Sequence, residues 1–140
     1  MNTRITIAEI THVIALLRTK LIEAGLGAWE IEPWLAKATA RLTRDLHDGT
    51  CAYFLEYHNG EPIAMAGALL RHDAAFLSLK AHRYGCVVDE YVLPAHRNHG
   101  LEPPLRAHAL AWIAEATART ETAIPPNAAR LAASSGGGKL

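Results

Sequence analysis

The sequence predicts an α+β fold in which a mixed, mostly antiparallel sheet is flanked by helices. Apolar residues recur every three or four positions in two early segments and one later segment, which is typical of helices with one buried face. In the middle of the chain the apolar period changes to two, around an Asn-Gly dipeptide that favours a hairpin turn. The predicted order is β-α-α-β-β-β-α-β-α, and consecutive strands of this kind favour antiparallel pairing.

The first third of the chain predicts a short strand and two helices. Residues 4–7 ("RITI") are β-branched and predict the strand. A helix follows from Ala8, and Gly25 is placed to end it in a left-handed conformation. A second helix begins at "EIEPW", where Pro33 fits the first turn because its missing N–H costs nothing there. The "HDG" sequence at 47–49 ends that helix.

The middle of the chain predicts strands and then a third helix. Residues 50–58 and 62–71 flank the "NGE" turn and predict a β-hairpin. Residues 73–83 predict a loop with a short strand at most. Residues 84–93 have few polar interruptions and predict a central strand. Residues 101–119 predict a helix with one apolar stripe.

The last segment completes a single domain. Residues 120–125 predict a short strand, and Asn127 fits the N-cap of a helix that ends near Ser135. A chain of 140 residues with 50% hydrophobic content has room for one core. We therefore expect one domain over residues 1–135, followed by a flexible tail at 136–140 ("GGGKL").

Composition excludes several classes of partner. Fourteen basic residues balance fourteen acidic ones, so no net field favours nucleic acid or an anionic membrane. No apolar stretch approaches the ~20 residues of a membrane span, and Glu9 and His12 interrupt the apolar N-terminus, which predicts no signal peptide. Cys51 and Cys86 lie in apolar runs and predict free thiols of a reducing cytosol. The expected location is the cytoplasm.

The most informative stretch is "VLPAHRNHGL" at 92–101, where a strand, a turn and a helix meet. A helix N-terminus exposes up to four unpaired N–H groups and about half a positive charge. Gly100 lets the backbone approach a ligand closely. Arg97, His99 and Arg106 add local positive charge. Together these features predict an anion site of the kind that binds phosphate.

The longer stretch "YVLPAHRNHGLEPPLRAHALAWI" resembles the acetyl-CoA motif of the GNAT family of N-acetyltransferases. That motif has a strand ending in Val-x-Pro, an Arg/Gln-x-x-Gly-x-Gly/Ala turn and a helix. Val92, Pro94, Arg97 and Gly100 match it, and the order of the other elements agrees with the family over nearly the whole chain. The resemblance implies the family's fold without its last strands, since the family continues beyond the point that Leu140 occupies here.

The resemblance also implies an activity and a site. The activity is transfer of acetyl from acetyl-CoA, as a substrate, to a primary amine of an unknown acceptor, without a metal. The strand would pair with the pantetheine arm, and the turn would face the diphosphate. The implied cofactor-binding residues are Tyr91, Val92, Leu93, Arg97, Asn98, His99, Gly100, Leu101, Glu102 and Asn127.

The chain departs from the family pattern at three positions. Glu102 replaces a small residue, and a carboxylate ~4 Å from a phosphate costs about 1–4 kcal/mol. Pro103 lacks an N–H, and losing one charge-assisted hydrogen bond costs about 1.5–3 kcal/mol. Ser134 stands where the family has an acid tyrosine, seven residues after Asn127. The alternative is therefore a weak or inactive module of the same fold that binds CoA or a protein partner.

Candidates for the proton transfers lie on the strand before the turn. Asp89 and Glu90 alternate faces, so that one of them points to a cleft as general base, and we favour Glu90. Tyr91 is the candidate acid for the thiolate, although we favour core packing as its role. The His-x-x-His pair at 96 and 99 has no cysteine near it, so we expect no metal site. An open edge of the shortened sheet predicts a homodimer.

Overall fold

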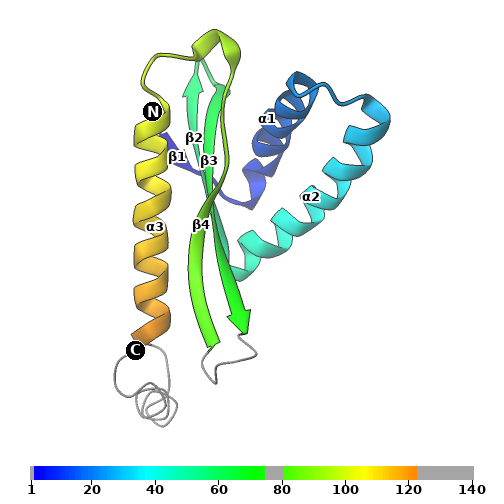
Figure 1. Cartoon of the computed structure of the whole chain (residues 1–140). Helices are drawn as coiled ribbons and strands as arrows, with labels where there is room; N and C mark the ends of the chain where they lie inside the picture. Colours follow the sequence, from blue (N-terminus) through cyan, green and yellow to red (C-terminus); the bar gives the residue numbers. More distant parts are fainter. Residues whose placement is uncertain (1, 75–80, 123–140) are drawn as a thin grey trace.

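The computed structural model of the chain describes residues 2–74 and 81–122. They form a four-stranded antiparallel sheet in the order β1-β2-β3-β4, with α3 on one face and α1 and α2 on the other (Figure 1). This arrangement confirms the predicted α+β fold. The elements are β1 (Asn2–Arg4), the 3-10 turn η1 (Ile7–Glu9), α1 (Ile10–Glu23), α2 (Ala28–Asp48), β2 (Cys51–His58), β3 (Glu61–Ala74), β4 (Ala81–Val92), the 3-10 turn η2 (Pro94–His96) and α3 (Glu102–Thr122).

Each face of the sheet carries its own hydrophobic core, because successive strand side chains point to opposite faces. The core under α1 and α2 includes Leu17, Leu42 and Leu55, all nearly inaccessible to solvent. The core under α3 contains the predicted apolar stripe of that helix, with Leu105 and Trp112 buried. Two independent cores therefore hold the sheet between its two helical layers.

The turn chemistry read from the sequence is confirmed at the β2–β3 hairpin. Asn59 has φ 52° and Gly60 has φ 79°, as a two-residue turn between antiparallel strands requires. Gly25 also has a positive φ, directly after α1. Short polar signals thus fixed where these elements end.

The two N-terminal boundaries differ from the prediction because a glutamate three residues further on caps each of them. The side chain of Glu9 accepts the backbone N–H of Thr6 at 2.8 Å, so a 3-10 turn starts where residues 4–7 were predicted to be a strand. Glu30 accepts the N–H of Gly27 at 3.1 Å and starts α2 at Ala28. Pro33 therefore lies beyond the first turn of α2, and its predicted place there is wrong.

Two further differences lie near the gaps in the described residues. The predicted loop at 73–83 is wrong at its ends, because the antiparallel ladder of β3 and β4 continues to Ala74 and Ala81. Backbone pairing does not depend on side-chain polarity, so polar residues do not end it. α3 continues to Thr122, through the start of the strand predicted at 120–125, because no Gly or Pro interrupts it. The rest of that strand, the helix from Asn127, and the tail lie outside the described residues.

Several expectations concern the chain as a whole. In the ranges that the structure describes, no helix combines the length and apolarity needed to cross a membrane. Cys51 and Cys86 are both free thiols. Across the same ranges, no three His, Cys, Asp or Glu side chains are grouped closely enough to hold a metal ion. The single domain, the cytoplasmic location and the homodimer stay predictions.

Candidate active site

A β-bulge interrupts β4 shortly before its end. Gly67 lies opposite Val88, whereas Met65 lies opposite Tyr91, so β4 carries one more residue than β3 in this interval. Asp89 lies within the bulge and has φ 54°, in the left-handed region that few residues other than glycine adopt. Bulges redirect side chains, and strained backbone is concentrated at functional sites.

The bulge places the two neighbouring carboxylates on opposite faces of the sheet, as the alternation predicted. Glu90 lies on the α3 face, where its Oε1 accepts a hydrogen bond from Arg106 Nη1 at 2.5 Å. Asp89 lies on the α1/α2 face, where it accepts a short hydrogen bond from the hydroxyl of Tyr53. The carboxylate that faces a cavity is thus Asp89, and the assignment of the base to Glu90 stays a prediction.

The cavity beside Asp89 lies between α2 and strands β2–β4 and has a volume of about 220 Å³. Its lining includes four charged residues, Arg41, Asp45, Arg71 and Asp89, together with the Tyr53 ring. Two positive and two negative groups therefore meet around a space large enough for a small polar molecule.

Burial sets the protonation of the two groups on β2 in this cavity. Burial, followed by the charge of Asp89, raises the pKa of Tyr53, so its hydroxyl stays protonated and donates. Burial also raises the pKa of Cys51 to about 12, which keeps it a thiol and makes it a poor nucleophile. Cys51 is therefore not a candidate nucleophile in this cavity.

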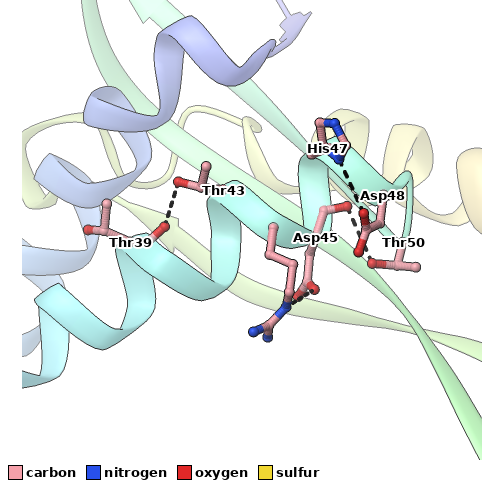
Figure 2. Close-up of polar contacts among 7 residues, drawn as sticks. Thr39, Thr43, Asp45, His47, Asp48 and Thr50 are labelled. Atoms are coloured by element: carbon pink, nitrogen blue, oxygen red, sulfur yellow. Dashed lines mark hydrogen bonds and ion pairs between the residues drawn. The ribbon is translucent and has the colours of Figure 1, made fainter.

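The end of α2 next to the cavity is fixed by short polar contacts (Figure 2). The Asp45 carboxylate pairs with Arg44 at 3.7 Å, and its backbone carbonyl accepts the Thr50 hydroxyl at 3.3 Å. Gly49 ends the helix with φ 74°. Asp45 thus has a partner on its own helix.

The turn after β4 presents a row of free backbone amides. The N–H of His96 donates to Leu93 O at 2.9 Å, and that of Arg97 to Pro94 O at 3.4 Å. Within the described parts of the chain, the N–H groups of residues 98–102 donate to no backbone carbonyl. Successive free amides around left-handed residues form an anion-binding concavity.

The start of α3 limits how many helical amides join that row. The helix begins at Glu102, so Pro103 and Pro104 are its second and third residues. Both prolines fit there because these N–H groups have no partner within the helix. They nevertheless remove two donors from the helix N-terminus, and an anion must rely on the amides of 98–102.

Arg97 joins the turn to α1 rather than pointing into the row of amides. Its Nη1 and Nη2 donate to the two carboxylate oxygens of Glu23, both at 2.7 Å, and its Nε donates to Val92 O at 3.0 Å. The Tyr91 hydroxyl donates to Glu23 at 2.7 Å. We call these three side chains, Glu23, Tyr91 and Arg97, the clamp. Nothing in the sequence identified Glu23, which lies 74 residues from Arg97.

The clamp changes the acid–base properties of its members. Hydrogen bonds from Arg97, and then from Tyr91, lower the pKa of Glu23 from 4.5 to about 2. Burial, and then the hydrogen bond to Glu23, raises the pKa of Tyr91 to about 12. Tyr91 is 8% exposed and packs in the core under α1 and α2, as the favoured role for this residue predicted. Its role as an acid stays a prediction.

The outer edge of β4 is open in the described sheet, where β4 is the last strand. Leu93 N–H donates to Ile63 O at 2.9 Å, so by alternation the N–H and C=O of Val92 point away from β3. The Val92 carbonyl already accepts Arg97 Nε, and its N–H stays available. An extended polar ligand can therefore lie along this edge with its anionic end at the amides of 98–102.

The order of the elements, the bulged fourth strand and the turn after it agree with the acetyltransferase fold that the sequence motif implied. The family model for the acetyltransferase (GNAT) family matches residues 17–132. The chain therefore belongs to the acetyltransferase (GNAT) family. The comparison with curated proteins gave no match.

Solved structures share the fold at low sequence identity. A GCN5-related N-acetyltransferase from Ralstonia eutropha JMP134 is 24% identical, with a TM-score of 0.71 over 84% of this chain and 77% of that one. A protein from Clostridium acetobutylicum, described as a predicted acetyltransferase with acetyl-CoA, is 18% identical, with a TM-score of 0.70 over 86% and 75%. An aminoglycoside 6'-N-acetyltransferase from Acinetobacter haemolyticus is 22% identical, with a TM-score of 0.61 over 84% and 73%.

The structure brings most of the predicted cofactor residues to one end of the sheet. Residues 91–93, at the end of β4, and residues 97–102, in the turn before α3, lie together there. Asn127 lies outside the described residues. Sequence reasoning missed Tyr53 and Glu23, and it ranked Asp89 second. One signal was available for the bulge: a glycine inside a strand, Gly67, is typical of a bulge or of a close backbone approach.

Proposed function

We propose that the protein transfers an acetyl group from acetyl-CoA to a primary amine. The observation that carries the proposal is the row of free amides at 98–102 next to the open edge of β4. The diphosphate of CoA binds at the amides, and its pantetheine arm pairs with the edge of β4 near Val92. Membership of the acetyltransferase family supports acyl transfer, and a neighbour whose description includes acetyl-CoA supports the cofactor.

The chemistry balances as one substitution at the thioester carbon. An ammonium first loses a proton, and the amine nitrogen then forms a bond to the carbonyl carbon while the carbon–sulfur bond breaks. The products are an N-acetyl amine, the thiol of CoA and one proton. A backbone N–H at the bulged end of β4 stabilises the oxygen of the tetrahedral intermediate, and a carboxylate of the bulge accepts the proton.

The two carboxylates of the bulge differ in fitness for that role. Glu90 is held by Arg106 on the α3 face. Asp89 faces the cavity and, among the described residues, accepts a hydrogen bond from Tyr53 alone. The geometry favours Asp89 as the base. Kinetics of Asp89→Asn and Glu90→Gln separate the two, since only the base's variant loses kcat steeply at unchanged acetyl-CoA affinity.

The alternative function is a CoA-binding module with weak or no catalysis. Glu102 and Pro103 favour it, because one adds negative charge to the amide row and the other removes a donor. Thiol release from acetyl-CoA with a panel of amines decides between the two, since a module binds the cofactor without releasing thiol.

The binding site is tested by calorimetry with acetyl-CoA on a matched pair of glycine variants. Gly100 and Gly49 have φ of 73° and 74°, and a Cβ at either would meet nothing within 4 Å. Alanine therefore strains both turns by a similar amount, on the order of 1 kcal/mol, but only Gly100 lies in the amide row. We expect Gly100→Ala, but not Gly49→Ala, to weaken the binding of acetyl-CoA. Equal affinity in both variants, or no heat with the parent protein, would refute the proposal.

A further inference from the structure

We infer that the acceptor amine carries a carboxylate, and that the cavity under α2 binds both of its ends. Asp89 receives the ammonium group, and Arg41 and Arg71 receive the carboxylate. This inference rests on the proposed function and assigns the acceptor class that the function leaves open.

The carboxylate of Asp89 is positioned by a device that spans three strands. Tyr53 on β2 lies opposite Gly67 on β3, and the Tyr53 ring crosses β3 at that glycine to reach Asp89 on β4. A Cβ on Gly67 would lie 2.6 Å from the Tyr53 ring, so the glycine is what allows the ring to lie there. The hydroxyl engages Oδ2 of Asp89, which leaves Oδ1 for a ligand in the cavity.

Among the described residues, the two arginines of the cavity lining have no direct carboxylate partner. Asp45, the nearest acid on α2, pairs with Arg44 (Figure 2). In residues 2–74 and 81–122, neither Arg41 nor Arg71 makes a hydrogen bond or an ion pair with a described residue, although both line the cavity. Arginine binds carboxylates through two parallel hydrogen bonds, so two unengaged guanidinium groups facing one small space form a carboxylate site.

The dimensions of the cavity favour a small acceptor. Its volume of about 220 Å³ is below the roughly 300–1,000 Å³ of sites for drug-sized ligands. The opposite charges of Asp89 and the arginines then require an ammonium and a carboxylate within one short molecule. An ω-amino acid of a few carbon atoms has this pattern, whereas a simple amine or a diamine has no group for the arginines.

The test compares acceptors that differ only at the end away from the amine. Thiol release from acetyl-CoA is measured with a series of ω-amino acids, their primary amides and the diamines of equal length. We expect the kcat/KM of the best amino acid to exceed that of its amide by at least about tenfold, the effect of one charge-assisted hydrogen bond of about 1.5 kcal/mol. Arg41→Gln and Arg71→Gln should each shrink that ratio. Lys37→Gln, which removes an exposed positive charge of α2 outside the cavity lining, should preserve it.

The outcomes separate this inference from the proposed function. Thiol release with equal rates for acid and amide, or a preference for the diamine, overturns the carboxylate site and leaves acetyl transfer standing. A thermal shift with the amino acid that Arg41→Gln abolishes, without thiol release, supports the carboxylate site and removes the transferase. If no member of the series gives thiol release or a thermal shift, the inference is overturned. If an acetyl-CoA titration then also gives no heat, the proposed function is overturned as well.

Discussion

Replacing Pro103 by alanine should tighten the binding of acetyl-CoA. The N–H groups of 98–102 have no backbone acceptor, and Pro103, the second residue of α3, is the position at which this row of donors stops. Alanine at 103 adds one N–H at the end of the helix where the macrodipole is positive. A charge-assisted hydrogen bond contributes about 1.5–3 kcal/mol, which lowers Kd roughly tenfold to a hundredfold.

Calorimetry of acetyl-CoA binding measures this change, with Pro104→Ala as the matched control. Both replacements raise the conformational entropy of the unfolded chain and so lower the free energy of unfolding by a similar amount, about 0.4–1 kcal/mol. Both also add one backbone N–H to the start of the helix. Pro104 lies one residue deeper in the helix, so its variant should gain less affinity. A Pro103→Ala variant that melts like the parent and binds acetyl-CoA no more tightly would show that the diphosphate does not lie at this helix end.

Three further predictions test the parts of the site separately. Glu102→Gln should lower the Kd for acetyl-CoA severalfold in calorimetry at low salt, and the gain should shrink at high salt because screening weakens charge repulsion. The pKa of Glu23 falls from 4.5 to about 2 on folding. In urea melts, the parent should therefore be more stable than Glu23→Gln by its full margin above about pH 4.5, and this margin should be lost as the pH falls toward 2. A difference in stability that does not depend on pH would contradict the clamp. Gly67→Ala places a Cβ 2.6 Å from the Tyr53 ring and should lower kcat while acetyl-CoA affinity stays constant, whereas unchanged kinetics would separate Tyr53 from the reaction.

The elements that depend on local signals were predictable from the sequence. The Asn59–Gly60 turn and the apolar stripe of α3 follow from backbone preferences and a period of 3.6 residues, and the structure has both. The geometry of the turn after β4 was predictable for the same reason, because its glycine and the helix start are adjacent in the chain, whereas anion binding there stays a prediction. The boundary errors arose where a side chain reached back three residues, as Glu30 does to Gly27.

The missing parts of the site depend on contacts between distant residues. Alternation correctly separated Asp89 and Glu90, but the bulge decides which of them shares a face with the Tyr53 hydroxyl. That choice depends on the register between β3 and β4. A bulge inserts one extra residue into β4 and shifts this register, and a single sequence gives little indication of where such a shift occurs. Glu23 illustrates the same limit, since its partner Arg97 comes 74 residues later.

The clamp also changes which groups the proposed cofactor site offers. Arg97 matched the family motif and was expected at the diphosphate, yet three of its donors go to Glu23 and Val92. Its charge is therefore balanced by Glu23, and the negative charge of Glu102 acts on the same guanidinium. The turn offers the diphosphate backbone dipoles rather than a net positive charge. In the proposed site, Arg97 contributes by fixing the shape of the turn, because it ties the turn to both α1 and the end of β4. A row of amides binds an anion well only when its N–H groups converge.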